Sequence, residues 1–241
     1  MKKVLGIIFS LIICLGFALS GCGAKKIELG NVLILGDSYS TFQGYLPSGY
    51  LTWYSTSENY DHSDVFKVED TWWWQVLDAT KSNLVENSSY SGSLICNAKD
   101  SYTSFITRFD LLATDGTLET NPVDTVFIFG GLNDDWSGAR MGDNKYSDWT
   151  DTDLEKVFPA FCYLLNSIKS ALPDARIIVI MDETLGVNIR SHFITACNYY
   201  AVEWIIPKKV SKQNSHPNKE GMKAISTQIM EMLKKAEESK K

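Results

Sequence analysis

Short apolar runs alternate with longer amphipathic stretches along most of the chain. The apolar runs lie at 32–35, 84–85, 125–129, 176–181 and 202–206. Runs of this kind, rich in β-branched residues and bounded by polar segments, are typical of strands in a parallel sheet that is covered on both faces. The pattern therefore predicts five buried, parallel strands.

Amphipathic stretches with helical spacing separate and follow these runs. They lie at 71–79, 101–113, 154–168, 189–200 and 222–233. A capping box from Thr152 to Glu155 is expected near the start of the third stretch, and Pro159 must kink that helix or lie in its first turn. Strands that alternate with helices predict an α/β fold, a three-layer α/β/α sandwich of the flavodoxin-like type with a parallel five-stranded sheet. Ligands bind at the carboxyl ends of the strands in such sheets.

The N-terminus has the pattern of an export signal. Lys2 and Lys3 precede an apolar run over 4–19, which is shorter than the roughly 20 residues that span a bilayer. Leu19-Ser20-Gly21-Cys22 resembles the bacterial lipobox, which implies removal of residues 1–21 and acylation of Cys22. We therefore expect an exported protein, anchored by lipid to the cell membrane and facing outside the cytoplasm. An ordinary signal peptide and an uncleaved anchor helix are the alternatives.

The remaining chain is long enough for one sizeable core. We expect a tether over 22–30, one folded domain over 31–235 and a tail over 236–241. Loss of residues 1–21 removes two of the 23 basic side chains and none of the 29 acidic ones, which leaves a net charge of −8. Nucleic acid is therefore not an expected partner. No obligate protein partner is evident.

Three cysteines remain after Cys22, at positions 96, 162 and 197. Their number is odd and none forms a CxxC pair, so the sequence predicts neither a disulfide framework nor a zinc site. Buried free thiols are the favoured interpretation, and one disulfide stays possible. The sequence also lacks a GxxxxGK[ST] loop and a GxGxxG motif, so we expect no nucleotide cofactor.

Polar residues follow the predicted strands at what should be one edge of the sheet. Ser38 comes directly after the first strand, where its hydroxyl can face solvent, although a Ser there can also be only a helix cap. Gly92 follows the second strand, and its N–H could bind an anion. Asn133 follows the third strand, where its amide can donate to a developing oxyanion. His216 follows the last strand, and it is the one histidine of three that is expected at this edge.

These residues form blocks that resemble the SGNH (GDSL-like) hydrolase family. Gly36-Asp37-Ser38 is similar to block I, Gly92 to the glycine of block II, and Gly131-Leu132-Asn133-Asp134 to block III. His216-Pro217-Asn218 is similar to block V, and the blocks come in the family's order. The resemblance implies hydrolysis of an ester or acetyl group, with Ser38 as nucleophile and His216 as base. It also implies an oxyanion held by the N–H groups of Ser38 and Gly92 and by the Asn133 amide.

The chain departs from the family pattern at Gln213. The family usually has Asp three residues before the histidine, and that acid orients the imidazole and stabilises its charged form. Three interpretations follow. The chain works as a Ser-His dyad whose imidazole donates to Gln213 or to a backbone carbonyl; Asp182 or Glu183 supplies the carboxylate; or catalysis is feeble.

The 30-residue segment from Thr41 to Asp70 leaves the strand that bears Ser38 and is rich in aromatic residues. A loop of this length without clear periodicity is usually functional. Trp53 and Tyr54 are predicted substrate contacts, whereas Trp73 is expected to pack a helix onto the sheet. The aromatic residues Trp136, Tyr146 and Trp149 could close the other side of the site.

The aromatic residues and the export signal favour O-acetyl groups of carbohydrate or cell-wall glycan as substrates. Short acyl esters or lysophospholipids are the next choice. The rival hypothesis is a surface glycan-binding protein that kept the fold and lost turnover. Six aspartates between 134 and 153 invite a calcium site, but they lack the spacing of an EF-hand loop. Capping and solvation are therefore favoured for them, and no metal is expected.

Overall fold

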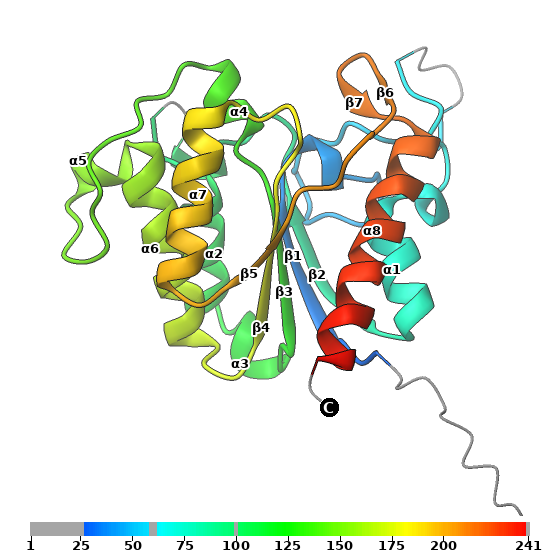
Figure 1. Cartoon of the computed structure of the whole chain (residues 1–241), viewed down its shortest axis with the longest axis horizontal. Helices are drawn as coiled ribbons and strands as arrows, with labels where there is room; N and C mark the ends of the chain where they lie inside the picture. Colours follow the sequence, from blue (N-terminus) through cyan, green and yellow to red (C-terminus); the bar gives the residue numbers. More distant parts are fainter. Residues whose placement is uncertain (1–26, 58–61, 99–100, 240–241) are drawn as a thin grey trace, which may run out of the picture.

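The computed structural model describes residues 27–57, 62–98 and 101–239 (Figure 1). The predicted signal peptide and Cys22 lie outside these ranges. A parallel five-stranded sheet has the order β2-β1-β3-β4-β5. The strands are β1 (Asn31–Gly36), β2 (Asn83–Ser89), β3 (Thr125–Phe129), β4 (Arg176–Ile180) and β5 (Glu203–Ile205). The predicted fold class is confirmed.

Two helical layers cover the sheet. Helices α1 and α8 lie on one face, and α2, α6 and α7 lie on the other (Figure 1). The helices are α1 (Trp72–Thr80), α2 (Phe105–Thr114), α3 (Thr117–Thr120), α4 (Leu132–Trp136), α5 (Asp151–Leu154), α6 (Val157–Ala171), α7 (Val187–Tyr199) and α8 (Lys219–Glu238). The short 3-10 turns are η1 (Ser38–Ser40), η2 (Val68–Asp70) and η3 (Ser101–Thr103). No helix among the described residues has the length and apolar character needed to cross a membrane.

The second strand is longer than its apolar residues predict. Its polar end, Asn87 to Ser89, is buried and paired with β1. Burial is possible because the side chains are bonded: Asn87 Nδ2 donates to the Ser40 carbonyl, and Ser89 Oγ donates to Asn87 Oδ1. The strand therefore carries part of the polar support of η1, which a search for apolar runs does not detect.

The start of the third long helix also differs from the prediction. The observed capping box joins Thr150 and Asp153 and begins the short α5, so the predicted box from Thr152 to Glu155 is wrong. The helix is interrupted after Leu154, and α6 begins at Val157 with Pro159 in its first turn. That position suits proline, because the first N–H groups of a helix have no intrahelical acceptor.

A small antiparallel hairpin follows the sheet. It consists of β6 (Lys212–Gln213) and β7 (His216–Pro217), and it lies at the same end of the sheet as α4 (Figure 1). Its two turn residues, Asn214 and Ser215, have φ values of 49° and 64°. Two-residue hairpin turns require such left-handed backbone, which Asn tolerates better than most residues. The hairpin, which the apolar pattern does not predict, carries His216.

Candidate active site

Ser38 lies on a tight turn at the end of the central strand β1. Asp37 caps this turn, because its carboxylate accepts from the Tyr39 N–H at 3.0 Å. Gly36 allows the close packing below: a Cβ on it would lie 2.4 Å from Ser89 Oγ and 2.5 Å from the Ser40 Cβ. Ser38 is 4% exposed, so only a small part of it reaches the surface.

The imidazole of His216 lies next to this hydroxyl. Its Nε2 is 2.9 Å from Ser38 Oγ, and its Nδ1 is 2.8 Å from the carbonyl oxygen of Asn214. A carbonyl only accepts, so Nδ1 carries the proton and Nε2 accepts from the Ser38 hydroxyl. This is the tautomer that a general base requires. The structure thus brings together the two residues that sequence placed at the same sheet edge.

The surroundings of His216 favour its neutral form. Burial lowers its pKa to about 4, and the electrostatic effects of the neighbouring His62 and Lys212 act in the same direction. The bond to Asn214 opposes the shift, because the donating N–H is stronger in the charged ring. His216 is therefore neutral near pH 7 and able to accept a proton.

Side-chain contacts hold the hairpin against the rest of the domain. The hydroxyl of Tyr39 donates to the Ser215 carbonyl, and that of Tyr54 donates to the Pro217 carbonyl at 2.8 Å. Lys212 Nζ lies 2.8 Å from Asp182 Oδ1. Tyr54 is completely buried, which does not fit the predicted substrate contact. Its position shows a structural role under the hairpin instead.

The acceptor of the imidazole is a backbone group. Gln213 pairs with His216 through the backbone of the hairpin, while Nδ1 is bonded to Asn214. The two carboxylates considered as substitutes have other partners. Asp182 accepts from Thr184 and Lys212, and Glu183 Oε1 accepts from the Val210 N–H. Of the interpretations open from sequence, the geometry matches the dyad with a backbone acceptor.

Two of the predicted oxyanion groups lie on neighbouring segments, Gly92 on the loop after β2 and Asn133 in α4. Gly92 has φ of 84°, and a Cβ on it would meet nothing within 4 Å. Asn133 lies in the first turn of α4, where its Nδ2 donates to the Ser93 carbonyl at 3.0 Å. Asp134 joins α4 to the loop after β2, because its carboxylate accepts from the N–H groups of Ile95 and Cys96. These bonds hold the Asn133 amide against the loop that bears Gly92.

The family model for GDSL-like lipases and acylhydrolases matches residues 30–233. The chain belongs to this family. A structure described as a GDSL-like lipase from Bacteroides ovatus ATCC 8483 is 36% identical, with a TM-score of 0.80, and the match covers 86% of this chain and 99% of that one. Another from Bacteroides uniformis ATCC 8492 is 38% identical, with a TM-score of 0.78, over 84% and 94% of the two chains.

A more distant structure, an acetyl xylan esterase from the rumen bacterium Butyrivibrio proteoclasticus, shares the fold at 13% identity and a TM-score of 0.56. The match covers 87% of this chain and 65% of that one. A search of curated proteins found no match. Family membership makes the chain a serine hydrolase that acts on ester bonds.

One supporting residue of this GDSL-like hydrolase was missed from sequence. Arg108 is buried in α2, and its Nη2 donates to the Gly36 carbonyl at 3.0 Å and to Ser93 Oγ at 3.2 Å. It therefore joins the end of β1, next to Ser38, to the loop that bears Gly92. A signal was present in the sequence, because this charged residue falls on the apolar face of its helix, between Phe105 and Leu112.

Two buried carboxyls below the site have raised pKa values. Burial raises the pKa of Asp37 to about 7, against the opposing bond from the Tyr39 N–H and the attraction of Arg108. Burial raises the pKa of Asp134 to about 6, although the backbone N–H groups that it accepts from lower it. Both groups cap or brace the loops of the site and lie outside the Ser38 to His216 contact.

The aromatic residues after block III lie in two different places. Tyr146 stacks on Tyr199, and Trp149 packs edge-on against Tyr163, so both belong to the outer face of the α6 and α7 layer. The expectation that they close the site is wrong. Trp136, at the end of α4, is 54% exposed. It lies three residues after Asn133, and residues at this spacing are neighbours on a helix surface.

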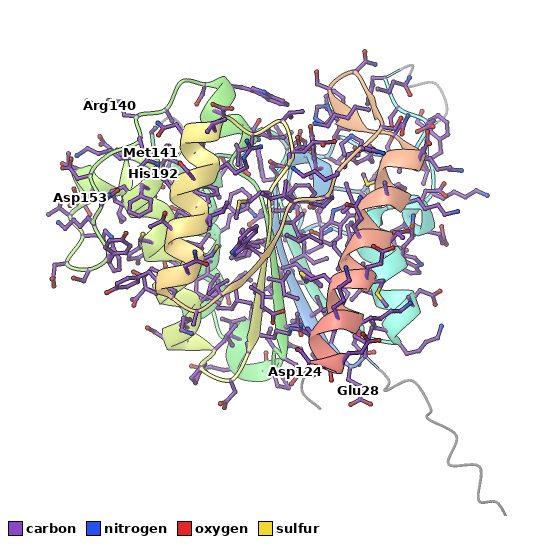
Figure 2. The ribbon with its side chains drawn as sticks, in the orientation of Figure 1. Glu28, Asp124, Arg140, Met141, Asp153 and His192 are labelled. Carbon is purple, nitrogen blue, oxygen red and sulfur yellow. The ribbon has the colours of Figure 1, made fainter. Side chains whose placement is uncertain are left out.

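Residues on the outer layer are visible in Figure 2. His192 and Asp153 lie on the side of α6 and α7, away from the hairpin that carries His216. His192 Nδ1 bonds to the Asn188 carbonyl of its own helix, as its predicted helical position implies. Asp153 caps α5 and pairs with Lys145 at 2.7 Å, which is the capping role favoured for this acidic segment.

The three cysteines within the described residues, Cys96, Cys162 and Cys197, are buried and free, as the favoured interpretation of the sequence expects.

Proposed function

We propose that this hydrolase cleaves esters through an acyl-enzyme on Ser38. The observation that carries the proposal is the 2.9 Å contact between Ser38 Oγ and His216 Nε2, with Nδ1 fixed on a carbonyl. Ser38 Oγ attacks the ester carbonyl carbon while His216 takes the hydroxyl proton. The negative oxygen of the tetrahedral intermediate is bound by the N–H groups of Ser38 and Gly92 and by the Asn133 amide.

The intermediate then collapses to the acyl-enzyme. The bond from carbon to the alcohol oxygen breaks, and the imidazolium gives its proton to that oxygen, so the alcohol leaves neutral. A water molecule then attacks the acyl-enzyme by the same route, with His216 again as base. Ser38 regains its proton, and the carboxylic acid is released.

Acetyl groups on carbohydrate are the substrates that we favour, followed by short acyl esters. Ser38 and His216 are 4% and 8% exposed, which suits a small acyl group better than a bulky one. The exposed indole of Trp136, three residues after Asn133 in α4, offers a flat apolar surface of the kind on which sugar rings can stack. The acetyl xylan esterase has the same fold, but at 13% identity the fold alone does not decide the substrate.

Two measurements test the reaction and its substrate. A fluorophosphonate probe should label wild type stoichiometrically and leave Ser38→Ala unlabelled. Acetate release from a panel of acetylated glycans, with p-nitrophenyl acetate and a lysophospholipid alongside, should then rank the substrates. Sugar binding without labelling of Ser38 would instead support the glycan-binding rival.

The export and anchoring of the protein form part of the proposal. The lipobox-like Leu19-Ser20-Gly21-Cys22 supports a lipid-anchored enzyme on the outer side of the cytoplasmic membrane. Growth with a clickable fatty acid should label wild type and not Cys22→Ala. Equal labelling of the two proteins would contradict the anchor.

A further inference from the structure

The indole of Trp53 lies flat on the imidazole of His216. The ring centroids are 3.5 Å apart, and the ring planes differ by 10°. Trp53 belongs to the long segment between η1 and η2, and its contact with His216 joins this segment directly to the base. The sequence predicted a substrate contact for Trp53, but the face of the indole toward the site is occupied by the catalytic ring itself.

Backbone bonds fix Trp53 to both halves of the dyad. Its N–H donates to Thr41 Oγ1 at 2.8 Å, and that hydroxyl donates to the Ser38 carbonyl at 3.0 Å. Its carbonyl is 3.1 Å from His62 Nε2, and the His62 carbonyl accepts from Asn214 Nδ2 at 3.1 Å. One chain of contacts therefore runs from the nucleophile turn through Trp53 to the hairpin of the base.

We propose that Trp53 is a positioning residue for His216, holding the imidazole plane so that Nε2 faces Ser38 without a carboxylate at Nδ1. The inference rests on the proposed function. A triad carboxylate restrains the ring through a strong, charged bond, whereas a neutral carbonyl restrains it less. A flat ring stacked on one face blocks rotation of the imidazole about its bond to Cβ. Trp53 thus supplies the restraint that the missing acid would give.

The stack also keeps water from the imidazole. The other groups around His216 come from three elements: Tyr39 of η1 packs edge-on at 5.2 Å, His62 comes from the long segment, and Lys212 lies on β6 with Asp182 as its ion partner. Loss of the indole lets water solvate the charged imidazolium, so the pKa of His216 should rise toward its ordinary value. The acidic limb of the rate profile should therefore move to higher pH.

The positioning role is tested with Trp53→Ala and Trp53→Phe, assayed on p-nitrophenyl acetate. We expect Trp53→Ala to lower kcat by about 100-fold, the scale of a small misplacement of a catalytic group, with little change in KM. Trp53→Phe keeps a flat ring and should recover most of kcat. Trp204→Ala, which removes an indole from the far edge strand β5, is the control and should match wild type. The acidic limb of the kcat/KM profile should move to higher pH for Trp53→Ala and should stay unchanged for Trp204→Ala.

The outcomes separate positioning from other roles. A raised KM with unchanged kcat and an unchanged pH profile would make Trp53 a substrate contact and overturn the proposal, as would wild-type kinetics. If Trp53→Ala does not fold, Trp53→Leu and Trp53→Phe are compared, because both keep a large apolar side chain and only Phe keeps a flat ring. Equal kcat values for these two variants would overturn the proposal. Failure of wild type to react with the fluorophosphonate probe at Ser38 would instead refute the proposed function, which the Trp53 variants do not test.

Discussion

The side chain of Asn133 offers a sharp test of the oxyanion site. A primary amide has two N–H donors, and one of them is already bonded to the Ser93 carbonyl at 3.0 Å. Ser93 is itself held, because its Oγ accepts from Arg108 and its N–H donates to the Tyr90 carbonyl. The amide is therefore oriented before substrate binds, and the second N–H remains for the negative oxygen of the intermediate.

Removal of that donor has a calculable effect. Loss of one oxyanion donor costs about 2.7 to 4 kcal/mol of transition-state stabilisation, which is roughly a 100- to 1,000-fold fall in kcat. The fall should appear in kcat more than in KM, because the charge develops only in the transition state. The lost bond to Ser93 should lower the free energy of unfolding by only about 0.5 to 1.5 kcal/mol, so Asn133→Ala should stay folded.

The assay is steady-state hydrolysis of p-nitrophenyl acetate, with urea unfolding of each variant. Asn133→Asp preserves the size of the side chain but replaces both donors by a negative charge, so it should be at least as inactive as Asn133→Ala. Ser137→Ala, at the end of the same helix, removes a hydroxyl bonded to the Asp134 carbonyl and should keep near-normal kcat. A kcat for Asn133→Ala within threefold of wild type would refute the role of this amide.

Three further outcomes follow from the geometry. With the pKa of His216 lowered to about 4, about 90% of the base is neutral at pH 5, against about 3% for an ordinary imidazole, so kcat/KM measured from pH 3.5 to 8 should fall only near pH 4. Tyr54→Phe leaves the buried Pro217 carbonyl without its donor, so urea unfolding should show a loss of about 1 to 3 kcal/mol in the free energy of unfolding. The pH dependence of kcat/KM should keep its shape in this variant. Asp134→Ala leaves the N–H groups of Ile95 and Cys96 unpaired, and it should lower both the unfolding free energy, by at least about 2 kcal/mol, and kcat.

Apolar patterning was sufficient for the fold, because buried parallel strands carry continuous apolar runs. The strand at Thr125–Phe129 has the bounds that the pattern predicts. The strand Asn83–Ser89 extends beyond its predicted bounds, because its last residues are polar and are buried with their hydrogen bonds made, which an apolar pattern does not detect. The block motifs at consecutive strand ends were enough to predict that Ser38 and His216 lie together, since the carboxyl ends of parallel strands meet at one edge of the sheet.

Details that depend on backbone direction or on contacts between distant loops could not be predicted. The direction of the Asn214 carbonyl follows from two left-handed turn residues, and neither is glycine, so no motif marks the turn. The stack of Trp53 on His216 joins segments that share no pattern. The same holds for Tyr54, whose aromatic character suggested a substrate contact although its hydroxyl donates to the Pro217 carbonyl of the hairpin.

The low pKa of the buried His216 bears on the kind of ester that suits this site. A base whose pKa is about 4 accepts the Ser38 proton less readily than an ordinary imidazole, but its imidazolium form is a stronger acid than an ordinary imidazolium. A strong acid helps most where the leaving oxygen is a poor leaving group, as in an alkyl or sugar alcohol, and helps least with p-nitrophenolate, which leaves without protonation. We therefore expect acid catalysis by His216 to help esters of ordinary alcohols more than activated aryl esters, and the ratio of kcat/KM for an alkyl acetate to that for p-nitrophenyl acetate, compared with the same ratio in an esterase that has the aspartate, tests this expectation.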